Sequence, residues 1–225
     1  VSTQSIVKKK PLGLWLYDQA GDQKEDLWGQ NDPKLTRMVL GLLEKAPMLA
    51  RAYSEKSLSL ALVDITVPNQ LRYALIRPDW EVFTASLSKI AVLLGVMSKI
   101  HKNRGILGFQ QVRKSANQMI KFSSNKQAAY LFRWAGFGFV RDGLYTHGLY
   151  RDKTGGLWWT PNARYPKSPK KHLQICGTAR QVARYLLLME QGKLINPRSS
   201  RVIKDVLHNS TLAIFFRGIK KVEPG

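Results

Sequence analysis

A serine and a lysine three residues apart carry the first chemical signal of the chain. The stretch "FTASLSKIAVLLGVM", residues 83–97, contains Ser86 and Lys89 and continues as an uncharged apolar run. A helix that is apolar all round is normally buried, so Lys89 is expected to enter a poorly hydrated environment. Burying an ammonium group costs several kcal/mol unless it is paired or loses its proton. Lys89 is therefore expected either to bind a partner or to act as a base.

The spacing of Ser86 and Lys89 fits a nucleophile and its base. On one helical face the lysine amine can reach the serine hydroxyl, and desolvation lowers the lysine pKa toward a value useful for a base. A helix N-terminus also adds positive partial charge at Ser86, where a backbone N–H can help to hold an oxyanion. Ser-x-x-Lys is common by chance, usually as a cap with a surface lysine. The apolar run after Lys89 strengthens the catalytic interpretation and leaves the cap interpretation open.

A second polar group stands at Ser123, Ser124 and Asn125, in a turn predicted between two helices. There a hydroxyl can relay a proton to a leaving group, and an amide can orient a substrate carbonyl. The competing interpretation is a helix cap, which is the commoner role of Ser-x-Asn at a helix start.

The flanking sequence predicts the elements that position these groups. Asp32 and Pro33 are typical of a cap and first turn, and they predict a helix to about Ala46. Two strand-like segments, 57–65 and 71–77, are joined by "VPNQ" and predict a hairpin.

Further helices are predicted after the buried one. They comprise an amphipathic helix around 109–120, a short helix that Gly136 ends, a helix capped by Thr178 and Gln181 and ended by Gly192, and a helix at 200–207. Residues 137–175 are rich in glycine, proline and aromatic residues without a clear period, which predicts a long irregular segment. The stretch "LAIFFRGI", residues 212–219, predicts a strand.

The ordered set of hairpin, Ser-x-x-Lys helix, Ser-x-Asn turn and "GTARQVARYLLLMEQGKLI" helix resembles the penicillin-recognising serine hydrolases, most closely their class A β-lactamase-like branch. The resemblance implies an α+β fold, an α/β sandwich whose antiparallel sheet is flanked by helices beside an all-helical lobe. It implies that Ser86 is acylated, Lys89 accepts its proton, Ser123 shuttles the proton and Asn125 contacts both the substrate and Lys89. The implied substrate is a small or peptide-like amide or ester, with no cofactor and no metal.

Two departures from the family pattern change this expectation. A "KTG" occurs at 153–155, but it precedes the "TARQ" helix that it should follow, so a coincidence within a glycine-rich loop is the favoured interpretation. The interval between Asn125 and that helix also has no glutamate to activate a deacylating water, and its only acids are Asp142 and Asp152. A slow hydrolase, a peptidase or transpeptidase-like acyl enzyme, or a protein that acylates and stalls is therefore expected rather than an efficient β-lactamase.

The charge supports an alternative function of another class. Lys and Arg number 36 against 15 Asp and Glu, a net charge of +21, which attracts polyanions such as nucleic acid, anionic lipid or an acidic cell-envelope polymer. The alternative is a non-catalytic basic domain of the same fold that holds such a polymer. The densest basic cluster, 164–172, contains two prolines and is expected to be a solvated loop.

One domain spanning 1–225 is expected, with an extension (1–30), a helix and hairpin (31–85), a mainly helical lobe (86–210) and a return to the sheet (211–225). A two-stranded hairpin is marginal alone, so further strands and a true Lys-Ser/Thr-Gly motif are expected beyond Gly225.

No apolar run reaches the roughly 18 residues of a membrane span. Export to the periplasm or the medium, with a signal peptide outside this sequence, is expected, and a cytoplasmic location is the alternative. His147 has no partner at a metal-ligand spacing, and Cys176 is expected to be a buried apolar residue.

Overall fold

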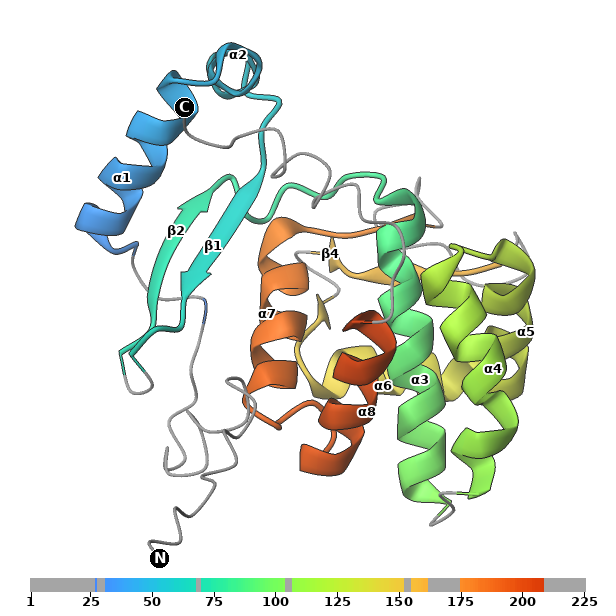
Figure 1. Cartoon of the computed structure of the whole chain (residues 1–225). Coiled ribbons are helices and arrows are strands. Elements are labelled where there is room, and N and C mark those ends of the chain that lie inside the picture. The colour runs from blue at the N-terminus through green and yellow to red at the C-terminus, as the bar shows by residue number, and fades with distance from the viewer. Residues whose placement is uncertain are drawn as a thin grey trace, which may run out of the picture.

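The computed structural model describes residues 27, 31–67, 70–103, 107–151, 155–161 and 175–208. Helices and small antiparallel sheets share this part of the chain, which confirms the α+β class (Figure 1). The helices are α1 (Pro33–Glu44), α2 (Pro47–Ser54), the 3₁₀ turn η1 (Ala85–Ser88), α3 (Lys89–Lys102), α4 (Leu107–Lys121), α5 (Asn125–Ala135), α6 (Phe137–Thr146), α7 (Ala179–Glu190) and α8 (Pro197–His208). The strands are β1 (Leu60–Asp64), β2 (Arg72–Ile76), β3 (Tyr150–Arg151), β4 (Gly155–Gly156), β5 (Trp158–Trp159) and β6 (Ile175–Cys176).

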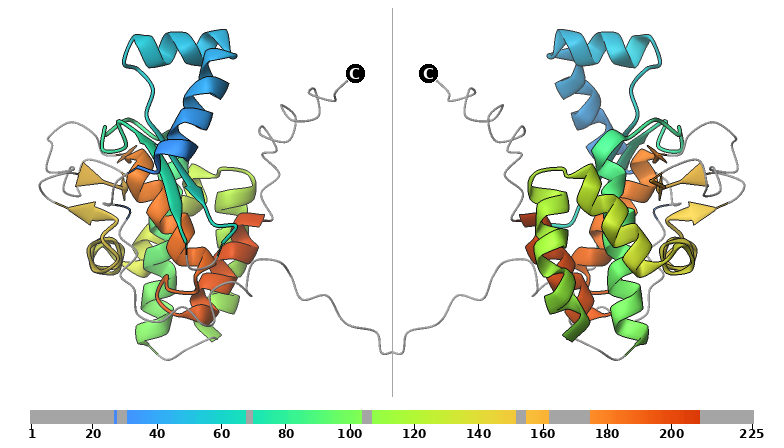
Figure 2. Two further views of the ribbon diagram at one scale, coloured as in Figure 1. Left: turned by 90° about the vertical axis from the view of Figure 1, so that its left-hand side faces the viewer. Right: turned by 90° about the vertical axis from the view of Figure 1, so that its right-hand side faces the viewer.

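The predicted helix and hairpin at the start of the described chain are both confirmed. The Asp32 side chain accepts a hydrogen bond from the Leu35 N–H at 2.7 Å, and Pro33 occupies the first turn of α1. Strands β1 and β2 pair antiparallel with Leu62 opposite Ala74. The buried apolar side chains of α1 and β2 form a small core of their own: Leu35, Val39, Leu43, Ala74 and Ile76. In both views of Figure 2, α1 and α2 stand at one end of the molecule, above the remaining helices.

Helix α3 is the centre of the larger core. Its residues Ile90–Met97 are all buried, as the apolar run predicts. Helices α4, α5, α6 and α8 pack around it (Figure 1). Gly95 allows the closest of these approaches, because a Cβ atom at this position would collide with Val140 of α6. The lysine at the start of α3 is thereby fixed to a buried helix that packs against four others.

The prediction that 137–175 is irregular is wrong for its first ten residues, which form α6. Gly136, with φ of 90°, ends α5 as predicted, and the chain turns there directly into α6. Gly138 and Gly143 lower the intrinsic helix propensity of α6, so packing of its buried residues Val140 and Leu144 determines the helix instead. The later part of the segment contains the two-residue strands β3 to β6, paired as β3–β4 and β5–β6.

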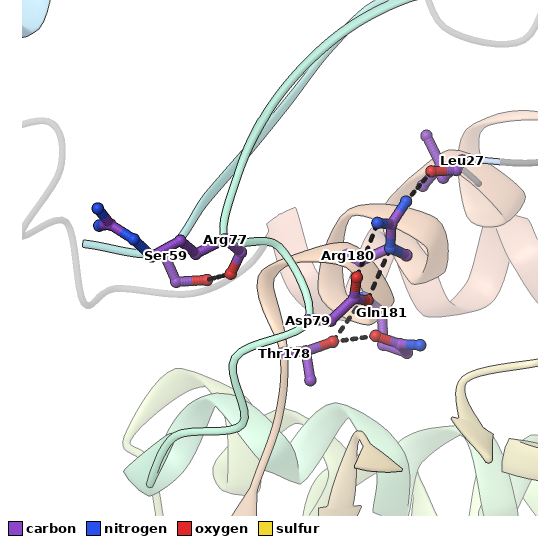
Figure 3. Close-up of polar contacts among 7 residues, drawn as sticks. All are labelled: Leu27, Ser59, Arg77, Asp79, Thr178, Arg180 and Gln181. Atoms are coloured by element: carbon purple, nitrogen blue, oxygen red, sulfur yellow. Dashed lines mark hydrogen bonds and ion pairs between the residues drawn. The ribbon is translucent and has the colours of Figure 1, made fainter. Parts of the chain in front are cut away.

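The connection from the hairpin to η1 is held by the N-terminus of α7 (Figure 3). The Arg180 guanidinium donates to both carboxylate oxygens of Asp79, at 2.7 and 2.8 Å, and the Arg180 N–H donates to the Pro78 carbonyl at 3.0 Å. Val82 and Gly177 exchange both backbone hydrogen bonds, at 3.0 and 3.1 Å. Because Ser86 follows this connection directly, α7 determines where the serine is presented.

Three further contacts in Figure 3 complete this junction. The Thr178 hydroxyl caps α7 by accepting from the Gln181 N–H at 3.2 Å, as the capping-box spacing predicts. The Ser59 hydroxyl donates to the Arg77 carbonyl at 3.0 Å and joins the two chain ends that flank the hairpin. The Arg180 guanidinium also donates to the Leu27 carbonyl.

Several predicted segments lie outside the described residues. They are most of the extension 1–30, the basic cluster 164–172 and the predicted strand 212–219, together with the rest of 211–225. The helix predicted at 200–207 is confirmed as part of α8. None of the described helices is both long and apolar enough to cross a membrane.

The junction predicts that two arginine substitutions differ in how much they lower the free energy of unfolding. We expect Arg180→Ala to lower the free energy of unfolding by about 2 kcal/mol or more, because the Arg180 side chain is only 10% exposed and Asp79 would lose both its hydrogen bonds to it. The control is Arg51→Ala, which removes an ion pair whose partners are 79% and 52% exposed and should cost less than about 0.5 kcal/mol. Urea unfolding curves measure both values, and equal losses would contradict the role given to Arg180.

Candidate active site

Ser86 lies on a turn rather than in the first turn of an α-helix. Residues Ala85–Ser88 form the 3₁₀ turn η1, and α3 begins at Lys89, so the predicted buried helix has a tighter start than expected. Ala85, directly before the serine, has φ of 47°. A left-handed backbone at a residue other than glycine costs of order 1 kcal/mol and is concentrated at functional sites. The Ser86 side chain is exposed at the end of the buried helix.

The Lys89 amine reaches three oxygen atoms of two serines. The residue is 1% exposed. Its Nζ donates to Ser86 Oγ at 3.0 Å, to the Ser123 carbonyl at 2.5 Å and to Ser123 Oγ at 3.0 Å. The expected burial of Lys89 and its pairing with Ser86 are both confirmed.

Ser123 joins this group from the turn between α4 and α5. Its φ of 53° is again left-handed, and its N–H contacts the Ile120 carbonyl at 3.4 Å. The Ser123 hydroxyl donates to Ser86 Oγ at 2.6 Å. The two hydroxyls and the amine therefore form a closed triangle in which each atom lies within 3.0 Å of the other two.

Burial of the triangle shifts the titration of its amine toward the neutral form. Burial lowers the pKa of Lys89 below its usual value of 10.5, because desolvation penalises the ammonium form. Among the described residues Lys89 forms no ion pair, so no carboxylate there opposes the effect. A neutral amine hydrogen-bonded to a hydroxyl is a suitable general base.

Asn125 lies near this triangle in sequence but is not part of it. It is the first residue of α5, its side chain is exposed, and it makes no hydrogen bond to the described residues. The helix cap in this turn is Ser124, whose hydroxyl accepts from the Gln127 N–H at 3.3 Å. The capping interpretation of the turn therefore holds for Ser124, and it leaves Ser123 free for the contacts with Lys89.

The acids named from the sequence do not join the triangle in the described structure. Asp142, on α6, is ion-paired with Arg141 and lines a cavity with Ser98 and His101. Ser98 is nine residues beyond Lys89 on α3, which corresponds to roughly 13 Å along the helix axis. Asp142 is therefore near the opposite end of α3, and Asp152 lies outside the described residues.

Sequence reasoning missed three residues around the site. Arg180 and Asp79 are 101 positions apart, so no local spacing indicates their ion pair. Glu81, five residues before Ser86, accepts a hydrogen bond from the Gly156 N–H at 3.4 Å. Its closeness to Ser86 in the sequence was the available signal.

Of the "KTG" letters, only Gly155 is among the described residues, and it opens β4, which pairs with β3. Lys153 and Thr154 lie outside the described residues.

Other candidate residues have structural roles. The His147 ring joins α6 to the turn after α7, because Nδ1 bonds the Gly143 carbonyl at 2.8 Å and Nε2 accepts from the Ile195 N–H at 3.0 Å. Trp158, Trp159 and Cys176 are buried in the larger core. No group of three or more His, Cys, Asp or Glu that could hold a metal ion occurs within the described ranges.

The depressed pKa of Lys89 predicts a pH-dependent stability. Below its pKa in the folded protein, Lys89 is protonated in both the folded and the unfolded chain, and the cost of burying its charge is fully present. Between that pKa and 10.5 the unfolded chain binds more protons, so stability rises with pH by at most about 1.4 kcal/mol per pH unit.

The test compares the wild type with Lys89→Met. We expect the free energy of unfolding of the wild type, minus that of the variant, to increase as the pH is raised from 7 toward 10. The exposed Lys126 supplies the control, because Lys126→Met should give a nearly constant difference. A constant difference for Lys89→Met as well would show that its pKa is not depressed.

Comparison with known proteins leaves the site to be interpreted from its own chemistry. No family model, curated protein or solved structure matches the chain. What remains is an exposed hydroxyl, a buried amine and a second hydroxyl within hydrogen-bonding distance of one another. Such a group can remove a proton from one oxygen and deliver it to a leaving group.

Proposed function

We propose that the protein is a serine hydrolase of the β-lactamase and penicillin-binding type, which forms an acyl-enzyme at Ser86 on an amide or ester substrate. The observation that carries the proposal is the triangle of Ser86, Lys89 and Ser123 around a desolvated amine. An activated nucleophile is recognised by such contact with a base that a third group orients. The triangle meets this description without a cofactor.

In the acylation step, Lys89 in its neutral form accepts the proton of the Ser86 hydroxyl. Ser86 Oγ then bonds to the substrate carbonyl carbon, and the bond from that carbon to the leaving nitrogen or oxygen breaks. Ser123, 3.0 Å from the amine and 2.6 Å from Ser86 Oγ, passes the proton to the leaving group. The backbone N–H of Ser86 has no backbone acceptor among the described residues and is available to the developing oxyanion.

The proposed fold is the α/β sandwich of the same class of enzymes. Its support is the order of the described elements: a hairpin flanked by α1, the Ser86 turn, the helical lobe with the Ser123 turn, and the α7 helix that returns to the hairpin. In this arrangement the nucleophile lies where the hairpin side of the molecule meets the helical side, a usual place for a substrate site. Asn125, exposed beside Ser123, is proposed to contact the substrate.

Covalent labelling tests the nucleophile. A fluorescent fluorophosphonate should label the wild-type protein, because the probe traps a serine whose proton is removed by a neighbouring base. Ser86→Ala should abolish the label. The matched control is Ser88→Ala, which alters a buried serine of the same turn whose hydroxyl donates to the Ala85 carbonyl, and this variant should be labelled. Labelling that survives in Ser86→Ala would remove Ser86 from the mechanism.

The acyl-enzyme is predicted to accumulate. A carboxylate that polarises the attacking water is missing from the described triangle, and Asp142 is near the other end of α3. Water must then attack the ester with Lys89 alone to assist. Intact-protein mass spectrometry after mixing with a penicillin should therefore show a mass increase that persists for minutes or longer. A rapid return to the free mass with many turnovers would refute this and would identify Asp152, Glu81 or Lys89 as a competent base.

A further inference from the structure

Exposed apolar side chains flank both serines of the triangle. Phe83 is 63% exposed and Phe122 is 64% exposed, the highest values for aromatic residues within the described ranges. Phe83 precedes Ser86 by three residues, and Phe122 directly precedes Ser123. Leu87, next to Ser86, is 50% exposed. Single exposed apolar residues are ordinary, but a group of them beside one site indicates a contact surface.

These side chains come from two chain segments that meet at the site. Ser86 Oγ and Ser123 Oγ are 2.6 Å apart, so the η1 segment and the α4–α5 turn touch there. Adjacent Cα atoms are about 3.8 Å apart, so the backbones of Leu87 and Phe122 lie next to those of Ser86 and Ser123. The Lys121 ammonium lies 5.3 Å from the centre of the Phe122 ring, within the range of a cation–π contact. We call Phe83, Leu87 and Phe122 the apolar rim.

The stretch that supplies the apolar rim, residues 82–141, is also one-sided in charge, and the nearest acid before it is Glu81. Neither Asp nor Glu occurs anywhere in residues 82–141, from which all three rim residues come. The ionisable side chains nearest in sequence to Phe122 are Lys121 and Lys126. A cationic group on the substrate would find no counter-charge from this stretch, whereas an uncharged hydrocarbon would cover the exposed rings.

We propose that the apolar rim binds the acyl part of the substrate, and that this acyl part is an uncharged hydrocarbon group. The inference rests on the proposed function, because it assigns the group that becomes attached to Ser86. In the reaction the acyl carbon bonds to Ser86 Oγ and the leaving group departs with the proton. Water then cleaves the new ester to give an apolar carboxylic acid and restores the Ser86 hydroxyl, with no oxidant or reductant.

The test is a series of p-nitrophenyl esters: acetate, butyrate and hexanoate. The burst of p-nitrophenolate gives each acylation rate constant, which is divided by the rate constant for hydroxide attack on the same ester to remove intrinsic reactivity. Each fully buried methylene favours binding by roughly three- to fourfold, and the rim covers only part of the chain. We expect the corrected value to rise about tenfold or more from acetate to hexanoate.

Variants locate this preference. Phe83→Ser and Phe122→Ser should each lower the hexanoate-to-acetate ratio by about threefold or more, while Phe122→Leu should largely keep it. The control is Met48→Ser on α2, which alters an 83% exposed apolar residue in another element and should leave the ratio at the wild-type value.

The outcomes separate this inference from the proposed function. Corrected rates that do not depend on chain length, with Ser86 still acylated, would overturn the apolar rim and leave the hydrolase intact. A ratio that is unchanged in both phenylalanine variants would also overturn it. The absence of a burst from every ester, together with no fluorophosphonate labelling, would overturn the proposed function and the rim with it.

Discussion

The burial of the Lys89 ammonium group is the constraint on which the rest of the site depends. At 1% exposure the amine has lost its water, and its hydrogen bonds run to one carbonyl and two hydroxyls instead of to a carboxylate of the described chain. An apolar residue of similar volume would fill the same space without the desolvation cost. A merely basic binding domain gains nothing from this arrangement, because the cation is hidden from any polyanion. The proton transfer proposed for Lys89 would give the buried amine a function.

Two distant parts of the chain keep the triangle in place. Helix α3 fixes Lys89 through its packing within the larger core, and the α4–α5 turn brings the backbone and side chain of Ser123 to the amine. Ser86 depends on a different anchor, since its turn follows a connection that α7 holds through Arg180 and Gly177. The left-handed backbone at Ala85 and Ser123 is tolerated because both neighbouring segments are held.

Local signals were enough for much of the fold and for half of the site. The Asp32 cap, the hairpin, the buried helix and the capped α7 follow from residue types within a few positions of each other, and so does the Ser86–Lys89 pair. The glycines of α6 lower its helix propensity, so its sequence did not predict a helix. Packing against α3 stabilises this helix instead. The Asp79–Arg180 pair joins residues 101 positions apart, and the contact of Ser123 with Lys89 spans 34. Such contacts form only in the folded chain, so local spacing in the sequence does not predict them. A resemblance to a known family is needed to name the residues that take part.

The most direct test is the position of the covalent bond itself. After brief reaction with a penicillin and acid quenching, trypsin should release the adduct on the peptide 73–89, because the bond between Arg77 and Pro78 resists cleavage. Fragment ions are predicted to place the added mass on Ser86. An adduct on the Lys89 amine, on Ser123 or on a residue elsewhere in the chain would contradict the assignment of Ser86 as the nucleophile.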